Sequence, residues 1–154
     1  MSVDLFEDHQ RRALGLLRAV VAELAPGQSE EVITTIAREH RAEHGFDRWL
    51  APPKVLLSPR PETRLRPVHS GARTLQPGDL VTLDLSPASD VAFGRACVTW
   101  CYQSPDDELL VKARQAVMGT CGYASKHKTV GELWIFANTW ALNRQMKLAR
   151  AADI

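Results

Sequence analysis

The 154-residue sequence predicts a single α+β domain in which a mainly antiparallel, curved sheet packs against helices. Three observations lead to this fold class. Apolar residues recur at helical spacing in both terminal regions of the chain. The middle of the chain alternates apolar and polar residues between Pro-Gly and Ser-Pro turns, as half-buried strands do. The order helix, turn, capped helix also occurs twice, with predicted N-caps at Ser29 and Thr129.

A pair of helices is predicted at the N-terminus. The first covers Asp4–Leu24, with apolar side chains on one face and charged ones on the other, and Pro26-Gly27 ends it. Ser29 is a natural N-cap for the second helix, which runs to about His44. Gly45 then supplies the left-handed position that commonly follows a helix.

The end of this second helix carries the pattern H-x-x-E-H, from His40 to His44. In some zinc proteases this pattern places two histidines on one helix face as metal ligands. The pattern is short, and it lies in the last helical turn, where the helix dipole itself favours histidine. We therefore interpret it as a solvated helix end rather than as a zinc site.

The central region predicts strands at Lys54–Ser58, Leu75–Leu85 and Val91–Tyr102. A long loop rich in proline and arginine separates the first two, and a turn at Ser86–Asp90 joins the last two. The middle strand carries Asp84 among apolar residues. Because an unpaired buried charge is costly, this carboxylate requires a partner, a metal ion or water.

A second helix pair is predicted at the C-terminus. Ser104-Pro105-Asp106 has the cap, the proline and the acidic residue that begin a helix. Thr129 and Glu132 form a capping box that begins the last helix. The core face of the third helix is expected to contain five residues, namely Leu109, Leu110, Ala113, Val117 and Cys121.

The repeated helix pair predicts how the domain is organised. A β region follows the first helix pair, whereas the chain ends after the second pair. We therefore expect one domain over residues 1–154, with a first α-α-β half at 1–103. Residues 104–154 then supply the two helices of an incomplete second half.

Composition excludes several kinds of partner. The chain has 19 Lys and Arg against 18 Asp and Glu, a net charge of +1, which argues against binding to nucleic acid or membrane surfaces through bulk charge. No apolar run is long enough to span a membrane. The N-terminus is unlike a secretory signal. Three cysteines without a C-x-x-C pair favour reduced core thiols and a cytoplasmic protein; they are Cys97, Cys101 and Cys121.

Several stretches resemble the creatinase, prolidase and methionine aminopeptidase superfamily, known for its "pita-bread" fold. The most specific is L-x-P-G-D-L-V-x-x-D, from Leu75 to Asp84. Other matching pieces, including APGQSEEVITTIAREH and KTVGELWIFA, follow the family's order between Leu14 and Ala141. The resemblance implies two α-α-β halves related by a pseudo-twofold axis, of which this chain has the first half and two helices of the second.

The resemblance also implies a set of site residues. Enzymes of the superfamily hold two metal ions with two hairpin aspartates and with one His and two Glu from the second half. Asp84 matches the first aspartate, and His69 best matches a substrate-contacting histidine. The second aspartate is replaced, either by Arg95 in an ungapped alignment or by Ala92 in an alignment on the FGR motif. Neither residue can bind a metal, and the strands that carry the other three ligands are missing.

Our first functional hypothesis is therefore a peptidase-like chain that has lost two-metal chemistry. Without a cofactor, it would bind or transform a peptide or a small amino-acid-like molecule. Arg95 would place a guanidinium where a metal cation lies in the family. The candidate catalytic residues are His69 and Asp84, and the candidate ligand-binding residues are Trp49, Asp90, Arg95 and Trp100.

The alternative is a metal-dependent hydrolase whose site is completed by another chain. A homodimer would cover the truncated half and bring two copies of Asp84 and His69 together. Only this alternative requires a divalent metal ion.

Overall fold

The structure is a computed structural model that describes residues 3–59, 73–126 and 128–146. The Arg-rich part of the predicted loop, including His69, lies outside these residues. The chain divides into two compact units, Met1–Pro105 and Asp106–Ile154. That the two units are halves of one incomplete domain stays a prediction.

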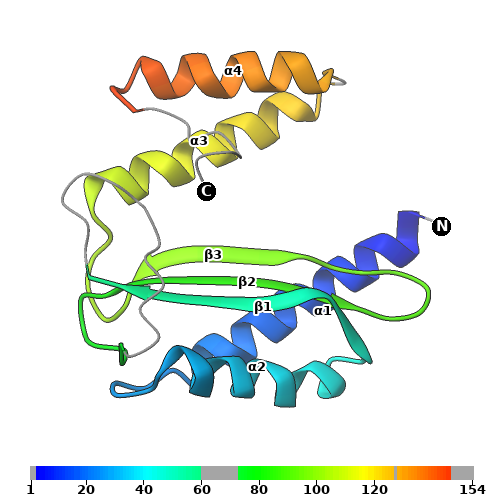
Figure 1. Cartoon of the computed structure of the whole chain (residues 1–154). Helices are drawn as coiled ribbons and strands as arrows, with labels where there is room; N and C mark the ends of the chain where they lie inside the picture. The colour runs from blue at the N-terminus through cyan, green and yellow to red at the C-terminus, as the bar shows by residue number, and fades with distance from the viewer. Residues whose placement is uncertain (1–2, 60–72, 127, 147–154) are drawn as a thin grey trace. The chain divides into compact units, whose positions relative to one another are not determined.

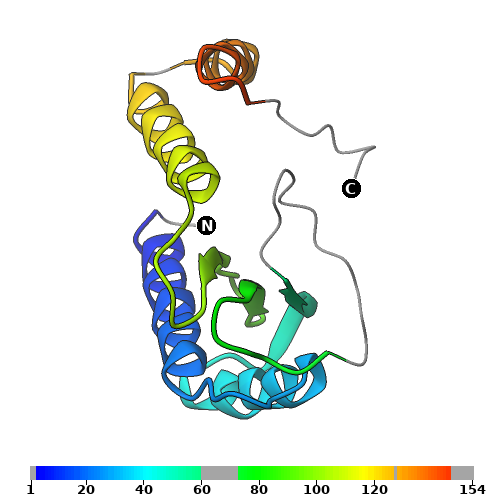
Figure 2. The same ribbon diagram turned by 90° about the vertical axis from the view of Figure 1, so that its left-hand side faces the viewer.

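The first unit is a three-stranded antiparallel sheet covered by two helices. Its elements are α1 (Val3–Ala22), α2 (Glu30–Glu43), β1 (Arg48–Ser58), β2 (Leu80–Ala88) and β3 (Ala96–Cys101). The strand order is β1-β2-β3, and both helices lie on the same face of the sheet (Figures 1 and 2). The predicted α+β fold class is confirmed.

Strand β2 supplies the centre of the core, because every second side chain from Val81 to Leu85 is apolar and points toward the helices. Val81, Leu83 and Leu85 are fully buried, and they lie in register with Trp100, Val98 and Ala96 of β3. Apolar residues of α1 and α2 complete this core, among them Leu16, Val20, Ile33 and Ala37. Since side chains alternate along a strand, the residues between them, Asp84 included, lie on the other face of the sheet.

The first residues of β1 and β2 were predicted wrongly. Strand β1 begins at Arg48 rather than at Lys54, with register shifts that accommodate Pro52 and Pro53 in an edge strand. Strand β2 begins at Leu80 rather than at Leu75. The backbone of Leu75 instead pairs with the α1–α2 turn, in hydrogen bonds of 2.8 Å to both Gly27 and Gln28.

The connection between β2 and β3 is also longer than the predicted turn at Ser86–Asp90, and it lies further along the chain because β2 continues to Ala88. Strand β3 begins at Ala96 rather than at Val91, because the preceding residues close the turn. Ser89 N–H donates to the Ala92 carbonyl oxygen at 2.8 Å, and Gly94 N–H donates to that of Pro87 at 3.0 Å.

Helix side chains bind the backbone at both edges of this sheet. On β1, a carboxylate oxygen of Glu30 accepts from Leu57 N–H at 2.8 Å. On the other edge, the amide of Gln10 binds the backbone of Arg95, directly before β3. Open strand edges invite pairing with other chains, and these contacts oppose it.

The second unit is a helix pair, α3 (Glu108–Ala124) and α4 (Val130–Leu142) (Figure 1). Its capping box at Thr129 and Glu132 is confirmed. Helix α3 begins later than predicted, because the side chain of Asp107, and not Ser104, caps it by accepting from Leu110 N–H at 2.7 Å.

The predicted core of α3 is only partly correct. Leu110 is buried, whereas Val117 is 62% exposed and Cys121 is also exposed. A pair of helices has one seam, so apolar residues away from that seam find no cover within the pair. Cys97 in the first unit is exposed as well, and of the three cysteines only Cys101 is a core residue as expected.

None of the helices in the described part of the chain is both long and apolar enough to cross a membrane.

Candidate functional site

The central polar feature of the sheet is an ion pair between Asp84 and Arg95. Arg95 Nε donates to Asp84 Oδ1 at 3.1 Å, and Arg95 Nη2 donates to Oδ2 at 2.8 Å. The β2–β3 register places Cys97 opposite Asp84, so Arg95 reaches the carboxylate diagonally from the same face. The Asp84 side chain is 17% exposed and that of Arg95 is 65% exposed. This two-bond geometry is the strong form of an arginine–carboxylate contact.

The pair changes the electrostatics of its surroundings. Its hydrogen bonds and the charge of Asp84 raise the pKa of the Arg95 guanidinium. Partial desolvation raises the pKa of the Cys97 thiol, the charge of Asp84 adds to this rise, and Arg95 opposes it. Because the thiolate is the reactive form of cysteine, Cys97 is held in a less reactive state.

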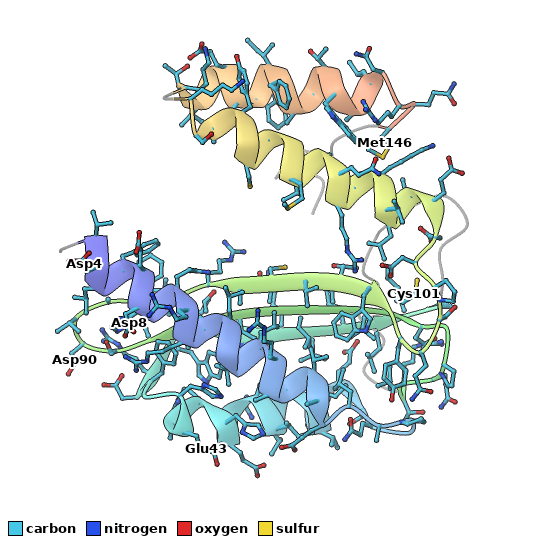
Figure 3. The ribbon with its side chains drawn as sticks, turned by 180° about the vertical axis from the view of Figure 1, so that it is seen from behind. Asp4, Asp8, Glu43, Asp90, Cys101 and Met146 are labelled. Atoms are coloured by element: carbon cyan, nitrogen blue, oxygen red, sulfur yellow. The ribbon has the colours of Figure 1, made fainter. Side chains whose placement is uncertain are left out.

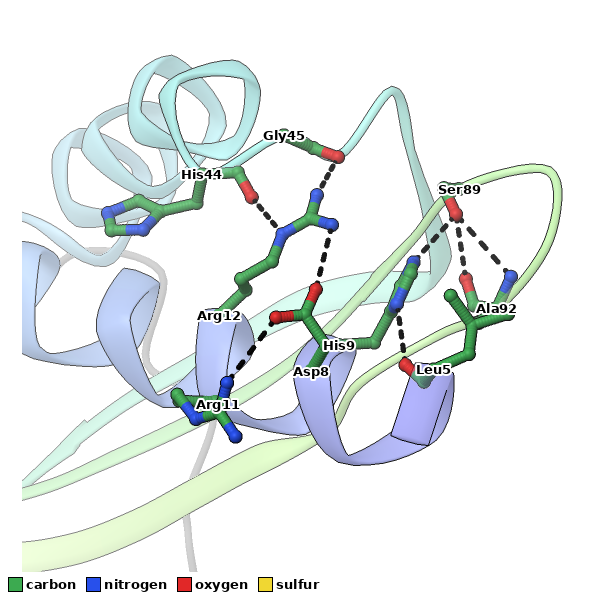
Figure 4. A network of polar contacts seen from close by, with 9 residues as sticks. All are labelled: Leu5, Asp8, His9, Arg11, Arg12, His44, Gly45, Ser89 and Ala92. Carbon is green, nitrogen blue, oxygen red and sulfur yellow. Dashed lines mark hydrogen bonds and ion pairs between the residues drawn. The ribbon is translucent and has the colours of Figure 1, made fainter. Parts of the chain in front are cut away.

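Helix α1 fixes the hairpin that carries Arg95. His9 is buried, with its Nε2 at 2.9 Å from Ser89 Oγ and its Nδ1 at 2.9 Å from the Leu5 carbonyl oxygen (Figure 4). A carbonyl can only accept, so Nδ1 carries the proton in the neutral ring. Nε2 is then an acceptor for the single Ser89 hydroxyl proton, for which the Ala92 carbonyl oxygen at 3.3 Å is the other acceptor. Neither His9 nor Gln10 was recognised as part of the site from the sequence.

The other predicted ligand-binding residues do not gather around this pair. Trp49 and Trp100 pack against the core on the helix-covered face, opposite to Asp84. Asp90 lies at the tip of the hairpin, where its carboxylate is 3.9 Å from Arg48 Nη2 (Figure 3). His69 lies outside the described residues.

Of the two residues proposed to replace the second family aspartate, only Arg95 contacts Asp84. Ala92 is buried in the hairpin turn.

The H-x-x-E-H pattern has its own structural role. His40 Nε2 lies 2.5 Å from a carboxylate oxygen of Glu23, and Nδ1 lies 2.7 Å from one of Glu43. The His40 side chain is 20% exposed and lies between two more exposed carboxylates, contacts that the sequence did not indicate. His44 faces Gly15 of α1, and its carbonyl oxygen accepts from Arg12 (Figure 4). Through these contacts, the two histidines of the pattern join the end of α2 to α1 and to Glu23, which follows α1.

Sequence comparison assigns the family of this fold. Residues 4–144 match the family model of metallopeptidase family M24. The chain belongs to this family. A search of curated proteins gave no significant match.

Three solved structures have a similar fold. The X-Pro aminopeptidase from Thermotoga maritima MSB8 is 13% identical with a TM-score of 0.74, and the match covers 92% of this chain and 41% of that one. The prolidase from Pyrococcus horikoshii OT3 is 18% identical with a TM-score of 0.74 and the same coverage. The methionine aminopeptidase from Thermotoga maritima is 16% identical with a TM-score of 0.61, covering 78% of this chain and 52% of that one.

At such low sequence identity, these matches establish the fold alone. It is a partial pita-bread fold, as the resemblance implied. The M24 chain spans about 41% of the length of the first two structures.

A metallopeptidase family implies metal ions, and the donors around Asp84 do not fit a two-metal centre. Both oxygens of Asp84 accept hydrogen bonds from Arg95. Across residues 3–59, 73–126 and 128–146, no three His, Cys, Asp or Glu side chains are grouped so that they could hold an ion.

Proposed function

We propose that this M24 chain has lost two-metal peptidase chemistry and binds a peptide or small amino-acid-like molecule beside the Asp84–Arg95 pair. The observation that carries this proposal is the engagement of both Asp84 oxygens by one guanidinium. A two-metal hydrolase needs free carboxylates that bridge its ions. A divalent ion at Asp84 would have to displace Arg95, which is a permanent cation.

The exposed part of Arg95 favours an anionic ligand. A guanidinium has five N–H donors, and Asp84 uses its Nε and one Nη2 donor. With the side chain 65% exposed, the outer donors are available to the carboxylate of a ligand. A dipeptide with a free C-terminal carboxylate has the required chemistry, and two similar structures are named as an X-Pro aminopeptidase and a prolidase.

The same face of the sheet offers polar groups for the rest of such a ligand. The hydroxyl groups of Thr82 and Thr99 lie 2.9 Å apart, two register pairs away from Asp84 and Cys97 along the strands and therefore on the same face of the sheet. His69 remains the candidate acid or base for any transformation of the ligand. Trp49 and Trp100 are left out of this proposed site because they lie on the other face.

Binding of a dipeptide and of its amide tests this function. Alanyl-proline and alanyl-prolinamide would be titrated separately into ¹⁵N-labelled protein, with the Arg95 Nε–H and Cys97 amide signals followed by NMR. The dipeptide is expected to bind at least about tenfold more tightly than its amide, because only the dipeptide has a carboxylate for Arg95. Arg95→Met should abolish this preference. Equal binding of the two compounds, or no binding of either, would contradict the proposal.

A second candidate is a metal-dependent hydrolase completed by a second copy of the chain. Apolar side chains that are exposed in the α3–α4 unit favour a covering partner; they include Val117, Met118, Trp134 and Ile135. A homodimer would bury this surface and would supply a second Asp84. Sedimentation equilibrium combined with metal analysis tests it, since a metal-free monomer would exclude this candidate.

We also propose a cytoplasmic location. Cys97 and Cys121 are exposed free thiols, which persist best in a reducing compartment.

A further inference from the structure

The backbone of Arg95 is held by a side chain 85 positions earlier in the sequence. Gln10 Nε2 donates to the Arg95 carbonyl oxygen at 2.6 Å, and Arg95 N–H donates to Gln10 Oε1 at 3.1 Å. A side-chain amide offers a donor and an acceptor in one plane, as a peptide group does. Gln10 therefore replaces a neighbouring strand at this one residue.

Arg95 needs this support because of its position in the hairpin. The continuous β2–β3 register begins at the pair Leu85 and Ala96, so Arg95 directly precedes the ladder. On its other side, a Cβ atom on Gly94 would lie 2.5 Å from the His9 carbonyl oxygen and 2.6 Å from Ala13 Cβ. Only glycine permits this close approach of the hairpin to α1.

The preceding helix residue holds the opposite strand of the same hairpin. His9 contacts Ser89 Oγ, before the tip, while Gln10 binds Arg95, after the tip (Figure 4 shows the contact of His9). Two adjacent residues of α1 thus define where the hairpin lies. The position of the hairpin in turn determines whether the guanidinium of Arg95 reaches Asp84.

We propose that Gln10 is a positioning residue that keeps Arg95 aligned with Asp84 and with an incoming ligand carboxylate. This inference deepens the proposed function and rests on it only for the role of Arg95 in ligand binding. Gln10 acts on the backbone of Arg95 and touches neither Asp84 nor the ligand. Its loss should therefore disturb the ion pair without removing any group from it.

The exchange of the Arg95 Nε–H proton with water measures this alignment directly. The experiment uses the full ¹⁵N-labelled chain, with the signal assigned by its loss in Arg95→Lys. Gln10→Met keeps the length of the side chain and removes both hydrogen bonds. We expect exchange to become about fivefold faster, the factor that one hydrogen bond of ordinary net strength confers. The dissociation constant of alanyl-proline should rise by a similar factor.

Two controls separate positioning from a general loss of structure. Glu7→Met changes an exposed residue on the same helix and should leave both quantities unchanged. Amide protection across the β2–β3 ladder should persist in Gln10→Met. If that variant does not fold, Gln10→Glu serves instead, because it retains the acceptor for Arg95 N–H and replaces the donor to the Arg95 carbonyl oxygen by a carboxylate oxygen.

Unchanged Arg95 Nε–H exchange in a folded Gln10 variant would overturn the positioning role. Faster exchange in a protein whose wild type does not bind alanyl-proline would support the positioning role and overturn the proposed function. The two ideas can therefore fail separately.

Discussion

Two clusters of ligand-type residues in this chain lie on opposite sides of its sheet, and each has found a partner within the protein. On the face away from α1 and α2, the carboxylate of Asp84 is bound by the guanidinium of Arg95. On the helix side, the imidazole of His40 lies between Glu23 and Glu43. Both occur in sequence patterns that hold metal ions in other proteins, and in both a charged side chain of the chain itself is the partner.

The two clusters differ in the nature of their cation. Arginine stays charged at all ordinary pH values, whereas histidine titrates near neutrality. A neutral imidazole has one N–H, so it can donate to only one carboxylate, and its other nitrogen would face a second acceptor. The contacts of both His40 nitrogens therefore require the protonated ring. The Asp84 pair should be permanent, and the His40 cluster should depend on pH.

The largest effect is expected from removing the permanent cation. Arg95→Met leaves the mostly buried carboxylate of Asp84 without its partner, which should lower the free energy of unfolding by about 1–2 kcal/mol after allowance for solvent screening. Urea denaturation measures this change. In the double variant Asp84→Asn with Arg95→Met, part of the loss should be recovered because no charge remains unpaired. A stability equal to that of the wild type in Arg95→Met would show that the pair contributes nothing.

The pH dependence of stability should come from the other cluster. Hydrogen bonds to Glu43 and Glu23 raise the pKa of His40 above its ordinary value of 6.5. A raised pKa in the folded state stabilises fully below pH 6.5, and this stabilisation is lost as the pH rises through the folded pKa. Unfolding free energies of the wild type and His40→Gln should therefore differ most at pH 6 and converge at alkaline pH. A constant difference between them would contradict the protonated state.

A smaller effect is expected at Cys97, whose reactivity reports the charge of the Asp84–Arg95 pair. Since Asp84 raises the pKa of this thiol, Asp84→Asn should lower it and speed alkylation by iodoacetamide at neutral pH. Cys121 in the α3–α4 unit is an exposed control thiol in the same chain, and its rate should not change. Peptide mass spectrometry resolves the two sites, and equal acceleration at both would point to unfolding.

Local chemistry in the sequence predicted much of the fold. The caps at Ser29 and Thr129 and the left-handed Gly45 were all correct, because each depends on a few adjacent residues. The strand starts at Arg48 and Ala96 were missed, because they depend on bulges and turn bonds that apolar alternation does not reveal.

The candidate site was harder to predict, since it combines distant segments. The Asp84–Arg95 contact was suggested by the family resemblance, because an ungapped alignment puts Arg95 at the position of the second metal aspartate. Gln10 was missed because nothing in an amphipathic helix marks one polar residue as the partner of a strand 85 positions away. Trp49 was expected to line the site of Asp84, but its pairing with Pro87 places it on the core side of the sheet.

The central claim is that Arg95 occupies the place of a metal ion at Asp84, and direct metal binding tests it. Purified protein freed of metal by chelation would be titrated with Mn²⁺, Co²⁺ and Zn²⁺ in a calorimeter, alongside Asp84→Asn. The account predicts no binding tighter than about 0.1 mM that depends on Asp84. Stoichiometric, tight binding that disappears in Asp84→Asn would contradict it.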